Sequence, residues 1–211
     1  PLELEFYLLT DDTYAVAWDE TRQHEKIVIP EMYYGKSVTK IIHNAFSGMN
    51  SLKEVVIPNT IKEIGERAFS GCTNLSKVTY NCTVNSIGDY AFYNSDNLVS
   101  VTNHGTTSIG NYAFYSCDNL TSVTSSASLL SIGDYTFKDN DKLTTFTVDG
   151  SVGTIGVSAF EDSDALSTVS ITGTVDRVCS KAFSDCDNVA TLAIRATTEV
   201  EDLAYEDMDG L

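Results

Sequence analysis

Aspartate recurs at a regular interval along the second half of the chain, and this row is the first candidate for chemistry. Intervals of 22 or 23 residues separate Asp96, Asp118, Asp141, Asp164 and Asp187. Ca²⁺ is a hard cation that binds clustered carboxylate oxygens, so stacked aspartates would offer it ligands. The chain has no EF-hand loop, and aspartate also makes local hydrogen bonds in solvated turns. The row therefore predicts either a Ca²⁺ ladder or a series of aspartate-containing turns.

A thiol and an imidazole form the second candidate, because a thiolate–imidazole pair can act as a nucleophile. Cys82 and His104 each lie ten residues before an aromatic residue, Phe92 and Phe114 respectively. No third group orients this pair, and the chain has no H-E-x-x-H, phosphate-binding glycine loop or G-x-S-x-G motif. We therefore expect a protein that is not an enzyme.

Three other cysteines share one repeated position, which Ser, Met or Asn fills elsewhere. They are Cys72, Cys117 and Cys186. A position that accepts these residue types is expected to be a buried turn, where a free thiol behaves as a small hydrophobic group.

Hydroxyl side chains dominate the outward positions of a recurring apolar–polar pattern. The residues expected to contact a binding partner are Glu54, Lys77, Thr79, Thr102, Thr124, Thr147 and Ser170. This surface lacks the aromatic and arginine side chains that dominate protein interfaces. Two other interpretations stay open: a solvated sheet with ordinary β-propensity, or a regular surface for a repeating ligand such as a glycan.

All of these regular positions belong to one internal repeat. Its most regular member is an aromatic residue: Phe46, Phe69, Phe92, Phe114, Phe137, Phe160 and Phe183. A β-branched residue stands five positions before each of these aromatics, and Leu or Val stands six positions after it. An eighth copy follows around Tyr205. Self-similarity at a fixed period predicts a solenoid.

Each copy predicts one strand and one turn. The segment from Leu143 to Val148 ends in strict apolar–polar alternation, which indicates a half-buried strand. Because one strand per copy cannot close a hairpin, equivalent strands must stack in parallel, about 4.8 Å apart. Between strands, Ile87 to Phe92 leaves room for a helical turn that sends Ala91 and Phe92 inward. The predicted fold is a mostly β, α/β solenoid, with one short parallel strand and one short helical turn per 22–23-residue repeat.

The first residues lie outside the repeat. Two strands, Leu4 to Leu9 and Thr13 to Trp18, are expected to form a hairpin that caps the first coil. We therefore divide the chain into an N-terminal capping β-hairpin, 1–26, and a solenoid, 27–211, of eight copies, the last incomplete. The start at Pro1 and the end at Leu211 lead us to expect an exported segment of a longer protein.

The second copy carries the most specific motif. It is Ile64-Gly65-Glu66-Arg67-Ala68-Phe69-Ser70-Gly71-Cys72-Thr73-Asn74-Leu75. This motif, and the chain from about residue 27 onward, resembles the BspA-like leucine-rich repeats of bacterial and protist surface proteins. The resemblance implies a leucine-rich repeat fold, a secreted or cell-surface location, and adhesion to a protein partner, with host extracellular-matrix or plasma proteins among the candidates. The alternative is a structural spacer or a carbohydrate-binding segment of a longer surface protein.

Composition narrows the partner class. The chain has 13 basic and 30 acidic residues, for a formal net charge of −17. Nucleic acids are excluded as partners, because binding phosphates requires clustered Lys and Arg. No apolar run in this segment is long enough to span a membrane. Tyr90, Tyr112 and Tyr135 share one repeated position and are expected to stack over the turns.

Overall fold

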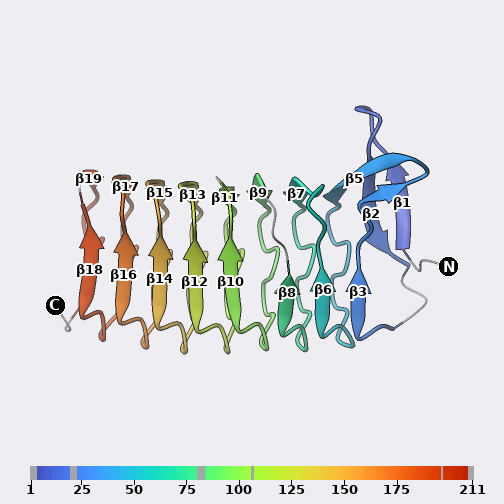
Figure 1. The fold of residues 1–211 in the computed structure, drawn as a ribbon. Helices are drawn as coiled ribbons and strands as arrows, with labels where there is room; N and C mark the ends of the chain where they lie inside the picture. The colour runs from blue at the N-terminus through green and yellow to red at the C-terminus, as the bar shows by residue number, and fades with distance from the viewer. Residues whose placement is uncertain (1–3, 20–22, 80–83, 106, 196, 209–211) are drawn as a thin grey trace.

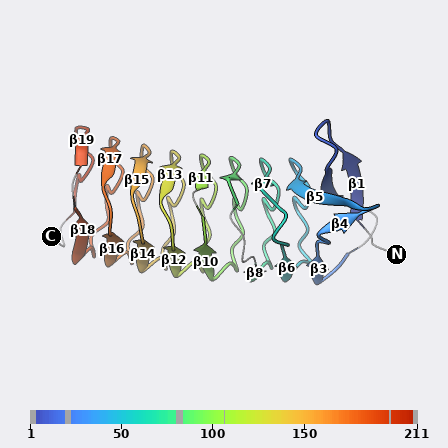
Figure 2. The ribbon, with the colours of Figure 1, turned by 45° about the horizontal axis from the view of Figure 1, so that its top comes forward.

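The protein is an elongated solenoid whose coils stack side by side from the N-terminal to the C-terminal end (Figure 1). A computed structural model of the chain describes residues 4–19, 23–79, 84–105, 107–195 and 197–208. Two rows of short strands run along the solenoid, one on each side of a continuous hydrophobic core (Figure 2).

One row is a single sheet that runs the whole length of the solenoid, here called the long sheet. Its strands, in spatial order, are β1 (Leu4–Leu8), β2 (Tyr14–Trp18), β5 (Lys36–Ile41), β7 (Glu63–Ile64), β9 (Ser86–Ile87), β11 (Thr107–Ile109), β13 (Leu129–Ile132), β15 (Val152–Ile155), β17 (Val175–Val178) and β19 (Thr197–Val200), with β4 (Met32–Tyr33) paired to β5. From β2 onward, neighbours along this order are parallel.

The other row, here called the second row, consists of two parallel sheets. The first contains β3 (Lys26–Val28), β6 (Glu54–Val56) and β8 (Lys77–Thr79). The second contains β10 (Ser100–Asn103), β12 (Ser122–Ser125), β14 (Thr145–Val148), β16 (Thr168–Ile171) and β18 (Thr191–Ile194). The second row is therefore interrupted between β8 and β10, whereas the long sheet continues past this point.

The predicted strands are confirmed, but each coil has more strand than predicted. Strand β14 lies within the segment Leu143 to Val148, as expected. The β-branched residue five positions before each aromatic forms a second strand, which the sequence analysis missed. Ile132 of β13, for example, pairs with Ile155 of β15. A coil thus has two strands, and its core is enclosed between two parallel sheets.

The predicted helical turn is wrong in detail, since no helix is found in the described residues. Residues in the aromatic turn adopt a left-handed backbone, such as Tyr112 with φ of 56° and Ser116 with φ of 50°. The Phe114 N–H donates to the Thr136 carbonyl of the next coil at 2.9 Å, and not to a residue one helical turn earlier. Left-handed residues and bonds between coils are both incompatible with an α-helix. The turns therefore join neighbouring coils. Among the described residues, the structure contains no helix long and apolar enough to cross a membrane.

Stacked aromatic rings form the centre of the core. Ring centroids of Phe46 and Phe69 are 5.1 Å apart, and those of Phe160 and Phe183 are 5.0 Å apart, with nearly parallel planes. The stack ends on Tyr205, 5.7 Å from Phe183. Each ring covers the face of its neighbour, so the core is assembled coil by coil.

The N-terminal hairpin is confirmed as a structural element. Strands β1 and β2 are antiparallel, with Leu4 opposite Trp18. Strand β2 also pairs in parallel with β5, so the hairpin extends the long sheet. The domain boundary at residue 26 stays a prediction.

Candidate functional site

Four of the predicted contact residues lie in one line across the second row. Thr102 pairs with Thr124, Thr124 with Thr147, and Thr147 with Ser170. An open hollow of about 300 Å³ lies over them. We call this surface, lined by Thr102, Thr124, Ser126, Thr147, Ser170 and Thr172, the hydroxyl face. It contains no aromatic or arginine side chain.

The other three predicted contact residues lie on the far side of the interruption. Glu54 is on β6, and Lys77 and Thr79 are on β8. The Glu54 carboxylate lies 3.1 Å from the Lys26 ammonium and 3.2 Å from that of Lys77. The hydrogen bond from Lys26, followed by that from Lys77, lowers the pKa of Glu54. The predicted contact set is therefore divided between two separate sheets.

The aspartate row lies in the turns that precede the second-row strands. Desolvation raises the pKa of Asp164, and the charges of Asp141 and Asp187 add to this rise. Desolvation and the charge of Asp118 have the same effect on the pKa of Asp96. The described residues contain no group of three or more His, Cys, Asp or Glu side chains that could hold a metal ion. The Ca²⁺ ladder stays a prediction, and desolvation, with repulsion from neighbouring carboxylates added to it, disfavours the ionised forms of Asp96 and Asp164.

Repulsion within the row gives a first testable prediction. Asp164→Asn should raise the free energy of unfolding at pH 7, because it removes a carboxylate whose ionised form is disfavoured in the fold. The gain should be only a few tenths of a kcal/mol, because Asp164 is exposed and solvent screens the neighbouring charges. Since the folded-state pKa of Asp164 is raised, its ionised form destabilises the protein above that pKa, and protonation removes this effect as the pH falls through it. Urea denaturation at pH 7 and at pH 4 should show that the advantage of the variant is smaller at the lower pH. An advantage that grows toward pH 4 would contradict the repulsion.

Aspartate also recurs at a second position in the same turns, and the backbone conformation explains why. Asp139, Asp162 and Asp185 have φ between 55° and 56°, in the left-handed region. Gly48 and Gly71 occupy the equivalent position in the first two copies, with φ of 71° and 69°. Asp and Gly tolerate this backbone better than most residues do. The recurrence of Gly at this position was the sequence signal that could have predicted the left-handed turn.

The regular cysteines are buried donors in the turn. The Cys72 thiol donates to the Phe46 carbonyl at 3.0 Å, and the Ser95 hydroxyl and Asn140 amide make the equivalent bonds to Phe69 and Phe114. The residue at this position is therefore a buried hydrogen-bond donor in the copies from Cys72 to Cys186, and Met49 fills it in the first copy. Burial raises the pKa of the Cys72 thiol to about 12, which disfavours the thiolate that a nucleophile requires.

The proposed thiol–imidazole pair lies only partly in the described structure. Cys82 is outside the described residues. His104 is exposed, and its Nδ1 lies 3.5 Å from the Ser126 hydroxyl. The four cysteines that the structure describes are free, and they are Cys72, Cys117, Cys179 and Cys186.

The tyrosines stack over the turns as predicted. Ring centroids of Tyr90 and Tyr112 are 4.8 Å apart, as are those of Tyr112 and Tyr135. The Arg67 guanidinium lies over the Tyr90 ring, 4.7 Å from its centroid. Tyr93 and Tyr115 form a second stack beside this one, with ring centroids 5.5 Å apart. A hydrogen bond with Asp139 and desolvation raise the pKa of Tyr115 to about 12. These rings are partly buried, so they stabilise the turns more than they offer a free surface.

A different aromatic cluster lies at the N-terminal end, where the repeat is broken. The Phe6 and Tyr33 rings stack with centroids 3.9 Å apart, and Tyr14 packs edge-on against Tyr33 at 5.1 Å. Tyr34 meets Tyr33 at 4.6 Å and leaves 83% of its surface exposed. We call this surface, formed by Phe6, Leu8, Tyr14, Met32, Tyr33 and Tyr34, the hairpin surface. It comes from β1, β2, β4 and the turn between β4 and β5 (Figures 1 and 2).

The hairpin surface was not predicted from the sequence. Leu8 of β1 and Met32 of β4 are 57% and 49% exposed, so the strands that carry this cluster also expose large apolar side chains. The available signal was the pair Tyr33-Tyr34, which has no counterpart in later copies. Its assembly with Phe6 depends on the antiparallel pairing of β4 with β5, and local sequence does not reveal such contacts.

Comparison with known proteins identifies the repeat. A family model described as BspA type leucine rich repeat region, with 6 copies, matches residues 15–107 and 100–211. A leucine-rich repeat protein of T. pallidum has a similar solved structure, with a TM-score of 0.67 and 22% identity, over 94% of this chain and 83% of that chain. This likeness supports the solenoid fold.

Two further solved structures match more loosely. A leucine rich cell surface protein from Faecalibacterium prausnitzii has a TM-score of 0.41 and 17% identity, over 99% of this chain and 92% of that chain. A leucine-rich repeat protein from Bacteroides ovatus has a TM-score of 0.43 and 18% identity, over 95% of this chain and 78% of that chain. The comparison with curated proteins gave no match. Because the family model covers the chain from residue 15 to its last residue, the chain belongs to the BspA-type leucine-rich repeat family.

Proposed function

We propose that this chain is a non-enzymatic, protein-binding module of a secreted or cell-surface protein, with adhesion to host extracellular-matrix or plasma proteins as its role. Membership of the BspA-type family suggests a surface role. The single observation that carries the proposal is the hairpin surface, because it concentrates exposed aromatic and apolar side chains at one irregular site.

The chemistry of this surface suits protein recognition. Tyrosine contributes a large contact area at a low cost in side-chain entropy, and it is enriched among the residues that dominate interface energies. Phe6 and Tyr14 support Tyr33 from two sides, so its ring is already held in place before a partner arrives. A preorganised aromatic cluster binds without the full ordering cost of a flexible loop.

The test is a binding assay on the purified chain. Immobilised extracellular-matrix and plasma proteins are screened, and any partner is then titrated against Tyr34→Asn. Asparagine tolerates the left-handed backbone of Tyr34, whose φ is 44°, so the turn should survive. We expect at least about a tenfold loss of affinity, the effect of an interface side chain worth about 1.4 kcal/mol.

The matched control is Leu130→Ala, which removes a 59% exposed apolar side chain from the long sheet, away from the hairpin. This variant should bind as the parent does. Equal affinities of the parent and Tyr34→Asn for every partner found would overturn the assignment of the hairpin surface. No binding to any immobilised protein would favour the spacer alternative.

A carbohydrate-binding function is the second candidate, and the hydroxyl face favours it. Its hollow is open and lined mainly by hydroxyl groups at one register position of successive strands, which suits a repeating polar ligand. Glycan-array binding that Thr124→Val weakens and Tyr34→Asn leaves unchanged would select this candidate over the first.

A further inference from the structure

The interruption of the second row leaves backbone groups without their repeat partners. In every other comparable pair of coils, an N–H at the start of a second-row strand donates to the preceding coil. Ser76 donates to the Lys53 carbonyl at 3.0 Å, and Thr121 donates to the Val99 carbonyl at 2.9 Å. The described residues show no such bond from Val99 or Ser100 to the carbonyl of Ser76.

The side chain at this position of the interruption also differs from those of the two neighbouring copies. Ser76 and Thr121 each add a hydroxyl hydrogen bond to the preceding coil, at 3.2 Å and 3.0 Å. Val99 stands between them in the repeat and has no hydroxyl, and 46% of its surface is exposed. Figure 1 shows a wider interval between β8 and β10 than between other neighbours of this row.

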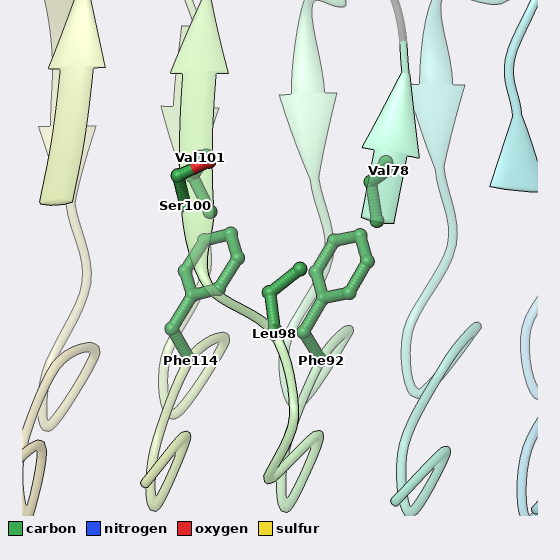
Figure 3. Close-up of a pocket in the computed structure, with 6 residues that line it drawn as sticks. All are labelled: Val78, Phe92, Leu98, Ser100, Val101 and Phe114. Atoms are coloured by element: carbon green, nitrogen blue, oxygen red, sulfur yellow. The ribbon is translucent and has the colours of Figure 1, made fainter. Parts of the chain in front are cut away.

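An apolar cavity lies beneath this interval. Figure 3 shows Val78 of β8 on one side and Val101 of β10 on the other, with Phe92 and Leu98 between them. The cavity measures about 10 Å³ and is almost entirely apolar, which leaves room for about one methyl-sized group. The core is therefore incompletely packed directly below the unpaired backbone edges.

We propose that the interval between β8 and β10, here called the slot, binds an extended peptide segment of a partner protein as an added β-strand. Two strand edges with unused donors and acceptors are a template for a third strand, since backbone amides are the groups that complement them. The cavity would take a small apolar side chain of the peptide. An inserted strand requires about 9.6 Å between β8 and β10, and the continuous long sheet keeps the coils joined while they separate.

The slot is independent of the hairpin surface and uses different chemistry. It recognises a backbone conformation with one small apolar side chain, so it selects extended segments in preference to folded surfaces. A peptide assay can therefore test it without knowledge of the natural partner.

The probe is a fluorescein-labelled peptide with the sequence of residues 166–172, Leu-Ser-Thr-Val-Ser-Ile-Thr, which contains a strand that already fits this sheet. We expect saturable binding, with a dissociation constant of about 10–500 µM. Hydrogen exchange should show protection around Ser76–Thr79 and Val99–Thr102. The same peptide with proline in place of valine is the control, and it should not bind.

Ser100→Pro is the discriminating variant, because it removes an N–H that the repeat directs into the slot. We expect at least about a tenfold loss of peptide affinity with little loss of stability. Thr168→Pro is its matched control in the continuous sheet, where the Thr168 N–H donates to the Thr144 carbonyl at 3.1 Å. That variant should lower the melting temperature clearly, since it breaks an existing rung.

Val101→Ile keeps the test decisive if Ser100→Pro fails to fold. Its added methyl group should fill the cavity, raise the melting temperature and lower the affinity for the peptide. Val169→Ile is the control at the equivalent packed position, and it should not stabilise the protein. Absence of saturable binding, protection at other strands, or unchanged affinity in both slot variants would overturn the proposal. Tyr34→Asn should leave peptide binding intact, so failure of the hairpin surface and failure of the slot are separate results.

Discussion

Phe137→Ala is expected to lower the free energy of unfolding by about 3–5 kcal/mol, the cost of emptying a buried aromatic site. The Phe137 side chain is completely buried. Its ring stacks between Phe114 at 5.4 Å and Phe160 at 5.1 Å, and the Phe146 ring packs at 5.8 Å. Hydrogen bonds between coils on both sides hold these neighbours in place, so they cannot collapse fully into the space.

Urea denaturation followed by circular dichroism measures this loss. Leu130→Ala is the control, since its exposed side chain should change stability by less than about 0.5 kcal/mol. A fall in the urea dependence of unfolding, together with the loss of stability, would indicate that the two halves of the stack unfold separately in the variant. A cost below about 1 kcal/mol would show that neighbouring coils can close the gap, contrary to a rigid stack.

The stack itself could be predicted from the sequence, because it depends only on the period. A residue that recurs every 22 or 23 positions must return to the same place in each coil, so Phe114, Phe137 and Phe160 had to be neighbours. The line of Thr102, Thr124 and Thr147 followed from the same argument, and the strand register confirms it. These positions were therefore placed correctly, whereas Thr79 obeys the same period but lies in a different sheet from Thr102.

Backbone conformation was less accessible to the same reasoning. The period showed that Tyr112 and Ser116 lie in a turn, but hydrogen bonds between coils select their left-handed backbone. These bonds alternate with short local bonds, such as the one that the Tyr115 N–H donates to the Tyr112 carbonyl at 3.2 Å. The second strand of each coil was missed for a related reason, since Ile132 and Ile155 pair only after the coils have stacked.

The irregular positions could not be placed from the sequence, and they are also where binding is proposed. The hairpin surface requires β4 to fold back on β5, which brings Tyr33 onto Phe6. The slot arises at Val99, whose N–H makes no bond to the described residues of the preceding coil, whereas the N–H groups of Ser76 and Thr121 do. A uniform repeat has equivalent sites along its length, so a specific partner requires such departures from the pattern.

Gly156→Ala is expected to cost about 3 kcal/mol or more, because coil spacing depends on the absence of a side chain at this position. A Cβ atom on Gly156 would lie 2.5 Å from the Gly133 carbonyl carbon, 2.6 Å from its oxygen and 2.7 Å from the Asp134 nitrogen. All three are backbone atoms of the preceding coil, so no side-chain rotation relieves the contact, and the coils must separate.

Gly48→Ala is the matched control for this prediction. Nothing lies within 4 Å of a Cβ at Gly48, but its φ of 71° makes alanine unfavourable by about 1 kcal/mol. Thermal and urea denaturation of both variants should show the larger loss in Gly156→Ala, although its backbone is not left-handed. Equal losses would mean that the coils can move apart without disrupting the aromatic stack. A larger loss of stability in Gly156→Ala would show that close backbone contact between Gly156 and Gly133 holds the rings at their spacing of about 5 Å.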